Sequence, residues 1–352
     1  MRRRGGPLKI ETLEMEGPQD DEVLVRLVAS GICHTDISYV DEWFEESEGP
    51  LVLGHEGAGI VERVGKKVKR TRRGDHVVLS YQSCGRCRPC RSERPTKCQY
   101  FYELNFGFKR LDGSNALHRS GVSGHFFGQS SFATHALATE RNLVKVPKNL
   151  PLETLAPLGC GLQTGAGTVM NSLAVPAGAS IAIFGTGAVG LAAVMAARIV
   201  GAGPIIGIDI VRSRLKLALE LGATHVIDNR REDVAARIRE TTGSGVDYTM
   251  ESTGDAKLYR LAVDVLNPKG TAAYLTGVSG PGYLSRGRRA LGIIQGDAVP
   301  QIFIPKLIAL YRKGLFPFDR LETFYDFRQV NRAMADARRG RSIKAVLRIS
   351  KV

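Results

Sequence analysis

Apolar and polar residues alternate along the first part of the chain, and the pattern changes near residue 160. Residues 22–30 alternate like a half-buried strand, while 51–64 and 75–80 are short, glycine-bounded runs rich in valine and isoleucine. These runs predict an antiparallel β domain with turns and loops. The tail at 343–350 predicts a closing strand, and one position for this strand is in the first domain.

Beyond residue 160, apolar runs alternate with helical stretches at the pace of βαβ units. Extended segments are expected at 180–184, 205–210, 225–228, 246–250 and 271–277, and helices at 191–201, 212–223, 231–242 and 255–266. This order predicts an α/β fold, with a doubly wound parallel sheet covered by helices. Residues 301–313 look helical, but Pro305 predicts an interruption there.

Length and cysteine content narrow the class of protein. The 352 residues suggest about two domains. No apolar run reaches the roughly 18 residues of a membrane span, and the basic start "MRRRGGPLK" lacks the apolar segment of a secretory signal. A cytoplasmic protein without a membrane partner is therefore expected. Six cysteines in such a protein favour metal or catalysis over disulfides.

The formal net charge of +14 raises the possibility of a nucleic-acid or other polyanion partner. The densest basic stretches are 63–73, 86–97, 286–289 and 338–344, and none has regular aromatic residues between its charges. We interpret this charge as mostly solvated surface that helps to attract a phosphate-bearing cofactor. A nucleic-acid partner is not expected.

The sequence "GTGAVG" contains Gly185, Gly187 and Gly190 in the spacing of a dinucleotide-binding turn. A strand precedes it, a helix follows, and Asp209 lies about 20 positions on, as in a Rossmann fold. A carboxylate there would bind the adenosine ribose and repel a 2′-phosphate, which favours NAD over NADP. Asp209 as a helix N-cap is the alternative, and Arg214, with its neighbour Arg212, could hold a 2′-phosphate.

Four cysteines occur within fifteen residues, in "CGRCRPCRSERPTKC". Cys84, Cys87, Cys90 and Cys98 have the spacing C-x2-C-x2-C-x7-C, which suits a structural, tetrahedral Zn²⁺ site. An iron–sulfur cluster is the rival interpretation. Since four protein ligands leave no open position, this site would hold a loop together and carry no reaction.

Three further candidates are scattered along the chain: Cys33, His55 and Cys160. Two thiolates and an imidazole match a catalytic zinc with one vacant position. Each residue alone is more typical of a buried cysteine or a hydrogen-bonded histidine, so the prediction depends on the set.

Several motifs together resemble the zinc-dependent medium-chain alcohol dehydrogenases over nearly the whole chain. They are "GICHTD", "GHEGAGIVERVG", the four-cysteine loop, "GCGLQTGAG", "GTGAVG" and "DIVRSRLKLALELGATHVID". Within that family the chain is most similar to the aryl-alcohol (benzyl-alcohol) dehydrogenase branch, through "YELNFGFKRLDGS", "FGQSSFATHALA" and "FIPKLIALYRKGLFPFDRL".

This resemblance implies a role for each matching residue. Cys33, His55 and Cys160 would bind the catalytic zinc, with Glu56 behind the metal as an occasional ligand and Asp36 orienting His55. Thr35 would take the hydroxyl position of the proton relay, and His34 would contact the cofactor pyrophosphate, although an exposed loop histidine is the alternative. Many relatives have a relay histidine where this chain has Ser38.

The resemblance also implies the domain organisation and the reaction. Residues 1–161 and 300–352 would form a GroES-like catalytic domain with a structural zinc loop at 84–98, and 162–299 a Rossmann domain. With two zincs per chain, the enzyme would transfer hydride between NAD and a primary, aryl or allylic, alcohol or aldehyde. An NADPH-preferring aldehyde reductase and a glutathione-adduct formaldehyde dehydrogenase are the alternatives. A homo-oligomer, dimer or tetramer, is expected, and Trp43, Phe44, Tyr81 and residues 102–106 are candidate walls of the substrate pocket.

Overall fold

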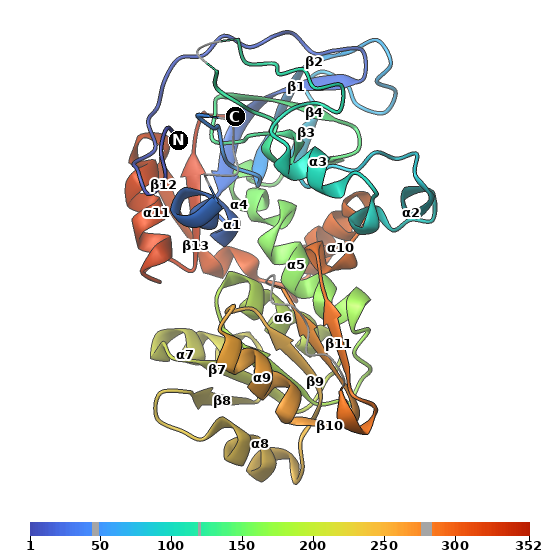
Figure 1. The fold of residues 1–352 in the computed structure, drawn as a ribbon, viewed down its shortest axis with the longest axis vertical. Coiled ribbons are helices and arrows are strands. Elements are labelled where there is room, and N and C mark those ends of the chain that lie inside the picture. Colours follow the sequence, from blue (N-terminus) through green and yellow to red (C-terminus); the bar gives the residue numbers. More distant parts are fainter. Residues whose placement is uncertain (44–48, 119–120, 276–283) are drawn as a thin grey trace. The chain divides into compact units, whose positions relative to one another are not determined.

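The structure is a computed structural model that describes residues 1–43, 49–118, 121–275 and 284–352. The chain divides into two compact units (Figure 1). Unit 1 comprises Met1–Gly161, Val299–Lys306 and Asp319–Val352, and unit 2 comprises Leu162–Ala298 and Leu307–Phe318. Of the described helices, none is long and apolar enough to cross a membrane.

In the described part of unit 1, seven strands form a sheet in the order β12-β13-β1-β2-β3-β5, with β4 also pairing with β1. Its strands are β1 (Glu22–Gly31), β2 (Gly57–Val64), β3 (His76–Leu79), β4 (His135–Thr139), β5 (Leu143–Lys145), β12 (Glu322–Asp326) and β13 (Lys344–Arg348). Adjacent strands are antiparallel, except that β12 and β13 are parallel. The closing strand predicted from the tail is confirmed as β13, which pairs Gly31 of β1 with Val346.

The alternating pattern of β1 accounts for its place in the middle of the sheet. Val23, Val25 and Leu27 are fully buried in one apolar cluster, which also holds Val77 of β3. Short helices lie along the chain between the strands of this unit. They are α1 (His34–Ser38), α2 (Arg88–Arg91), α3 (Phe101–Phe106), α4 (Leu152–Leu155) and α11 (Val330–Arg338).

The strand predicted over 51–64 is shorter than expected, because only Gly57–Val64 is extended. Gly54 turns the chain with a φ of 89°, a conformation that side chains other than glycine rarely adopt. The residues before Gly57 therefore form a loop, and this loop carries His55 and Glu56.

The described residues of unit 2 form a six-stranded, fully parallel sheet in the order β11-β10-β9-β6-β7-β8. The strands are β6 (Ile181–Phe184), β7 (Ile205–Asp209), β8 (His225–Asp228), β9 (Val246–Glu251), β10 (Leu266–Tyr274) and β11 (Arg289–Gly292). The helices are α5 (Gly161–Gly167, which begins on the last residue of unit 1), α6 (Ala188–Ile199), α7 (Arg212–Leu221), α8 (Val234–Thr242) and α9 (Ala256–Asp264).

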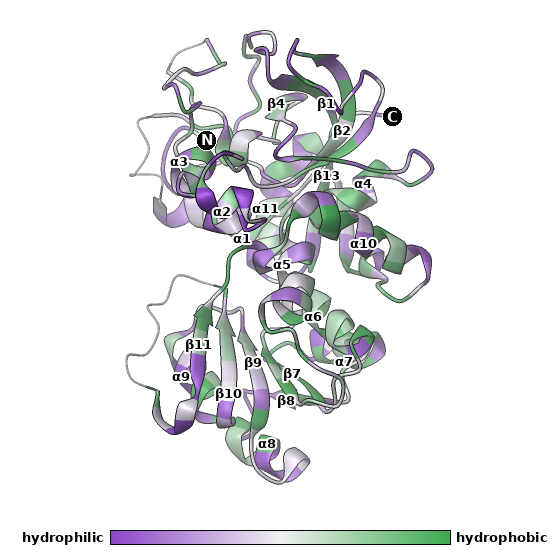
Figure 2. Cartoon of the chain, turned by 90° about the vertical axis from the view of Figure 1, so that its right-hand side faces the viewer, coloured by the Kyte–Doolittle hydropathy of each residue, from purple (hydrophilic) through white to green (hydrophobic). Residues whose placement is uncertain are grey.

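Strand β7 shows how the sheet of unit 2 is covered. It is hydrophobic along most of its length (Figure 2) and completely buried, as expected for a strand with both faces covered. Ile206 and Ile208 pack in one cluster with residues of α8 and α9, whereas a Cβ at Gly207 would lie 3.4 Å from Ala218 of α7. Because neighbouring residues face opposite sides, helices cover both faces, and the predicted Rossmann-type architecture is confirmed.

Helix α10 (Pro300–Arg312) differs from two sequence-based expectations. It continues through Pro305, so the predicted interruption is wrong. Phe303, Ile304 and Leu307 are buried on both sides of the proline, and this burial outweighs a cost of about 3 kcal/mol for proline in a helix. The domain boundary expected at residue 300 also differs, because Leu307–Phe318 belong to unit 2. The boundary falls inside this continuous helix, where no change in the pattern of apolar residues marks it.

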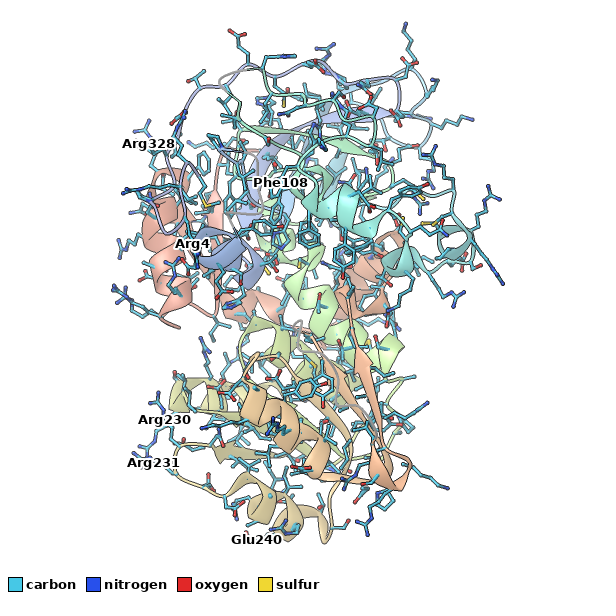
Figure 3. The ribbon with its side chains drawn as sticks, in the orientation of Figure 1. Arg4, Phe108, Arg230, Arg231, Glu240 and Arg328 are labelled. Carbon is cyan, nitrogen blue, oxygen red and sulfur yellow. The ribbon has the colours of Figure 1, made fainter. Side chains whose placement is uncertain are left out.

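Many of the basic side chains are exposed. Arg230 and Arg231, between β8 and α8, and Arg328 point away from the ribbon (Figure 3). Others pair with acids on the surface, as Arg338 does with Asp41 at 2.7 Å. This arrangement agrees with the interpretation of the charge as largely solvated.

Candidate active site and metal centres

Among the described residues, two groups of potential metal ligands lie in unit 1. In the first, Cys33, His55, Glu56 and Cys160 each place one ligand atom within 4.8 Å of the other three. Cys33 precedes α1, the pair His55–Glu56 precedes β2, and Cys160 follows a turn of 3-10 helix. Three segments distant in sequence thus supply one compact set of sulfur, nitrogen and oxygen donors.

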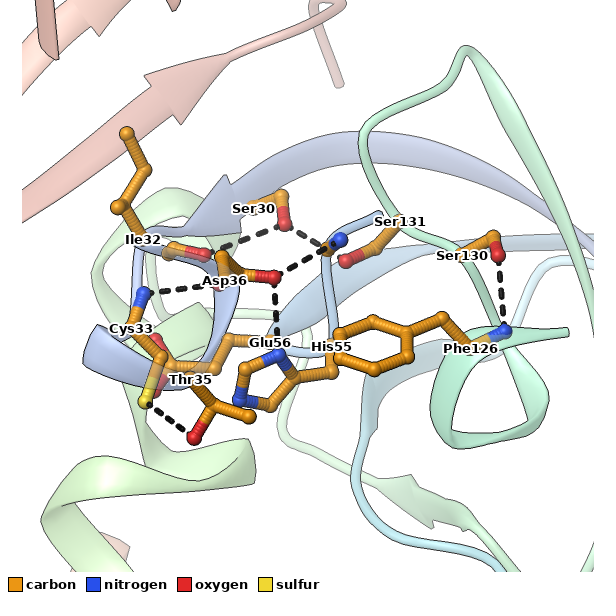
Figure 4. A network of polar contacts seen from close by, with 12 residues as sticks. Ser30, Ile32, Cys33, Thr35, Asp36, His55, Glu56, Phe126, Ser130 and Ser131 are labelled. Carbon is orange, nitrogen blue, oxygen red and sulfur yellow. Dashed lines mark hydrogen bonds and ion pairs between the residues drawn. The ribbon is translucent and has the colours of Figure 1, made fainter. Parts of the chain in front are cut away.

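Asp36 connects two of these segments (Figure 4). Its fully buried carboxylate accepts hydrogen bonds from the Cys33 N–H at 2.9 Å and the Gly54 N–H at 3.0 Å. The Nδ1 atom of His55 lies 3.1 Å from Asp36 Oδ1. Because a carboxylate only accepts, this contact places a proton on Nδ1 and leaves Nε2 as the nitrogen available to a metal, which is the arrangement expected for a metal-binding histidine.

The Nε2 atom of His55 is buried and has no hydrogen-bond partner among the described residues. A buried, unsatisfied nitrogen is unfavourable, and a metal ion would satisfy it. Burial alone would lower the pKa of His55, but Asp36 and the Cys33 thiolate raise it to about 10. These surroundings therefore favour a cation at the imidazole, and the residues present fit a zinc ion.

The two thiols of this group interact with each other. A hydrogen bond from Cys160 lowers the pKa of Cys33 well below its ordinary value, and the same contact raises the pKa of Cys160 well above it. This contact therefore favours the thiolate form of Cys33 over that of Cys160. Because the thiolate is the form that binds metal, this pair suits Zn²⁺.

Aromatic side chains surround His55. The ring of Phe127 stacks on the imidazole with centroids 4.4 Å apart, and Phe126 meets it edge-on at 5.4 Å. Phe106 extends this aromatic cluster, 5.0 Å from Phe127. The cluster gives one ligand of the donor set an apolar, rigid support.

Two further buried residues, Lys344 and Gln129, support this group, and the sequence motifs do not predict this role. Gln129 accepts a hydrogen bond from Gly57 N–H and donates to the carbonyl oxygens of His55 and Ser80. Lys344 contacts the carboxylate of Glu56 at 2.6 Å. The only sequence signal for Gln129 is its place in the quoted segment "FGQSSFATHALA".

The other residues assigned from the resemblance lie near this group or at its edge. Thr35 Oγ1 is 3.8 Å from Cys33 Sγ, and His34 is exposed on the first turn of α1. Tyr81 is buried and packs against Phe101, with ring centroids 5.7 Å apart. Phe44 and the side chain of Trp43 lie outside the described part of the chain.

The second group of potential ligands is the four-cysteine loop. Cys84 and Cys90 have their sulfurs 3.9 Å apart, and Cys87 and Cys98 4.0 Å apart. A tetrahedron with Zn–S bonds of about 2.3 Å requires sulfurs roughly 3.8 Å apart, so the spacing fits zinc. All six cysteines of the chain are free thiols.

The glycine motif lies in unit 2 between β6 and α6. A Cβ at Gly190 would approach Gly185 O to 1.8 Å, so only glycine lets the helix pack this closely. Gly185 has a φ of 88°, and the space around Gly187, the N-cap of α6, is open. This geometry leaves the N-terminus of a twelve-residue helix accessible to a phosphate.

Asp209 ends β7 and is almost completely buried. Its Oδ2 accepts hydrogen bonds from the backbone N–H and the hydroxyl of Thr186, within the glycine motif, at 2.7 and 2.9 Å. Val211 is the N-cap of α7, so Asp209 is not the helix N-cap that was considered as an alternative. Arg214 lies in the first turn of α7.

Comparisons with known proteins agree with this geometry. The alcohol dehydrogenase GroES-like domain matches residues 19–148, and the zinc-binding dehydrogenase domain matches 188–294. Geraniol dehydrogenase of Castellaniella defragrans is 44% identical over 99% of this chain and 96% of its own length. Solved structures of similar chains include an alcohol dehydrogenase zinc-binding domain protein from Burkholderia ambifaria (50% identical, TM-score 0.95) and benzyl alcohol dehydrogenase from Acinetobacter calcoaceticus (44% identical, TM-score 0.94). Each of these two matches covers 99% of this chain and 97% of the chain in the solved structure.

The fold, the donor set and these similarities define the class of protein as an alcohol dehydrogenase acting on small molecules. The chain belongs to the zinc-dependent medium-chain alcohol dehydrogenase family, with a GroES-like domain and a Rossmann-like parallel sheet. The resemblance found in the sequence motifs is therefore confirmed.

Proposed function

We propose that this protein is a zinc-dependent oxidoreductase that transfers hydride between NAD and a primary aryl or allylic alcohol or the corresponding aldehyde. The observation that carries the proposal is the donor set of Cys33, His55 and Cys160, with a buried His55 Nε2 that has no hydrogen-bond partner among the described residues. Zinc held there would keep one position for the substrate oxygen and would polarise it as a Lewis acid.

The surrounding residues have supporting roles in this proposal. Asp36 fixes the tautomer and orientation of His55, and the hydroxyl of Thr35 accepts the proton released by the alcohol while it passes its own proton on toward the nicotinamide ribose. The aromatic cluster of Phe106, Phe126 and Phe127 limits water beside His55. Cys84, Cys87, Cys90 and Cys98 hold a second, structural zinc. The family resemblance supports a homo-oligomer, whose dimeric or tetrameric state light scattering would establish.

Similarity to relatives supports the proposed substrate class. A geraniol dehydrogenase and a benzyl alcohol dehydrogenase are both 44% identical to this chain over almost its whole length. Geraniol is allylic and benzyl alcohol is benzylic, so in both the hydroxyl-bearing carbon adjoins a π system. An aldehyde conjugated in this way is the product common to both.

A substrate panel tests the proposal. NAD-linked oxidation of benzyl, cinnamyl and geranyl alcohols should exceed that of saturated alcohols of similar size by roughly tenfold or more in kcat/KM, a difference of about 1.4 kcal/mol. Equal rates on saturated alcohols would contradict the substrate class. A preference for NADPH, or a requirement for added glutathione, would instead support the alternative enzymes.

The choice of NAD depends on Asp209, because its carboxylate would accept the ribose hydroxyls and repel a 2′-phosphate. Asp209→Asn should therefore narrow the ratio of kcat/KM for NAD over NADP by roughly tenfold or more. Steady-state kinetics with both cofactors measures this ratio. An unchanged ratio would show that Asp209 does not select the cofactor.

A further inference from the structure

Lys344 is a buried lysine beside the first donor set. Its side chain is only 3% exposed, and a buried lysine is rare unless it is paired. The Nζ atom donates hydrogen bonds to Ile32 O at 3.0 Å and to Glu56 Oε1 at 2.7 Å, and it lies 2.6 Å from Glu56 Oε2. Ile32 precedes Cys33 and Glu56 follows His55, so one ammonium group joins both ligand-bearing segments.

The Glu56 carboxylate is held from several sides. Its Oε1 also accepts a hydrogen bond from the N–H of Gly161, the residue after Cys160, at 3.0 Å. A Cβ at position 31 would lie 2.0 Å from Oε2, so Gly31 makes room for this oxygen. Oε2 has no aligned hydrogen-bond donor among the described residues despite its contact with Lys344. This oxygen is therefore the one least restrained by hydrogen bonds.

The same carboxylate is close enough to become a metal ligand. One of its oxygens lies within 4.8 Å of the ligand atoms of Cys33, His55 and Cys160. A zinc ion and the Lys344 ammonium group would thus compete for Glu56. A buried carboxylate that loses its cationic partner is strongly destabilised, and it either takes up a proton or turns to another cation.

We propose that Lys344 is a positioning residue that holds Glu56 away from the catalytic zinc, so that the fourth coordination position stays open for substrate. This inference rests on the proposed zinc function of Cys33, His55 and Cys160. Without Lys344, Glu56 would turn to the metal and close that position.

The residue opposite Lys344 on the neighbouring strand, Glu322, does not compete with Glu56 for the ammonium group of Lys344. Glu322 on β12 pairs in register with Lys344 on β13. Burial raises the pKa of Glu322 to about 9, so this carboxyl group is neutral at pH 7. The ammonium group of Lys344 is therefore directed to Glu56, and the parallel pairing of β12 and β13 sets its position.

The test compares Lys344→Met, which removes the charge, with Lys344→Arg, which keeps it. Arg348→Met is the matched control, because Arg348 is on the same strand with an exposed side chain that pairs with Glu153 at 3.5 Å. The double variant Lys344→Met/Glu56→Gln removes both partners. The proteins are loaded with Co²⁺ and titrated with imidazole while the visible spectrum is recorded. Only an open metal position responds, since the four-cysteine site has no vacancy.

We expect imidazole to change the visible spectra of the wild type, Lys344→Arg and Arg348→Met. The affinity of Lys344→Met for imidazole should be at least roughly tenfold weaker. The double variant should regain the response, because a neutral amide side chain at position 56 does not replace the carboxylate as an anionic ligand. A normal response of metal-loaded Lys344→Met would overturn the inference.

Metal content separates the remaining outcomes. If Lys344→Met fails to fold or to hold metal, the double variant Lys344→Met/Glu56→Gln tests the inference instead, because it leaves no unpaired buried charge. A double variant that also fails to fold or to hold metal would overturn the inference. Wild-type protein with one zinc per chain, and without alcohol oxidation, would overturn the proposed function itself. Two zincs in the wild type with a normal response of Lys344→Met would overturn only the role of Lys344.

Discussion

The two donor groups of unit 1 are built in opposite ways. The four-cysteine loop takes its ligands from fifteen consecutive residues, and its own backbone supports them: the N–H groups of Cys84, Cys87 and Tyr100 each point to a cysteine sulfur at 3.4 Å. The group around His55 takes its ligands from three distant segments and is supported by the side chains of Asp36 and Lys344.

This difference has a physical reason. A closed site needs only that four sulfurs reach one ion, and a short loop achieves this by itself. An open site must keep one position free of protein ligands, including a nearby carboxylate, so each ligand needs its own restraint. In this protein, buried polar side chains support the proposed catalytic group, whereas backbone N–H groups support the proposed structural one.

Loss of a ligand from the open site should have the largest effect on activity. Cys33→Ala removes one thiolate without changing the four-cysteine loop, so we expect zinc content to fall from two to one per chain. Turnover should drop by roughly 10³-fold or more, which corresponds to about 4 kcal/mol of barrier. Metal analysis and NAD-linked oxidation of benzyl alcohol measure both. Full activity in the variant would show that Cys33 does not hold the catalytic metal.

Loss of a ligand from the closed site should mainly reduce stability. Cys98→Ala leaves three thiols that hold zinc poorly, and the free energy of unfolding should fall by roughly 3 kcal/mol or more. The melting temperature should then fall by about 10 °C. Calorimetry checks the stability, and kcat per folded molecule should stay near that of the wild type. A variant of normal stability that loses only turnover would contradict the structural assignment.

The two groups also differ in how much of them the sequence predicts. The loop is visible as a spacing, because its four ligands are neighbours in the chain. Cys33, His55 and Cys160 are convincing only together and through their surrounding motifs. Asp36 follows from its place beside Cys33 in "GICHTD", but Lys344 is 288 residues from Glu56 and looks like an ordinary polar position in the strand "IKAVLRIS".

The fold shows the same limit. Periodicity predicts most strands and helices of both units, since burial on one or both faces determines which positions are apolar. It does not predict that α10 continues through Pro305, because the burial of Leu307 and its neighbours depends on tertiary packing. It also does not predict that 51–56 is a loop, because the φ of Gly54 is needed to bring its N–H to Asp36.

A change in the support of the open site should have an intermediate effect. Asp36→Asn keeps the shape but replaces one acceptor oxygen with an N–H₂ group, which would oppose at least one of three donors: Cys33 N–H, Gly54 N–H and His55 Nδ1–H. We expect zinc affinity at this site to fall by about 10- to 100-fold. Competition with a chelator measures it, with Asp112→Asn on an exposed turn as control. Equal affinities would mean that Asp36 does not orient His55.

The smallest effect is expected from the arginines that surround the closed site. Arg88 and Arg91 are exposed on α2, so replacing both with alanine should change the free energy of unfolding by less than about 0.5 kcal/mol each and leave turnover unchanged. Their charge would matter only if the loop bound a polyanion. Titration with duplex DNA at about 150 mM salt distinguishes the two cases. Electrostatic binding releases counterions from the DNA, so its affinity falls as the salt concentration rises. Salt-dependent binding that the double variant loses would show that the loop is an interaction surface as well as a clip, whereas equally weak binding by both proteins would confine its role to structure.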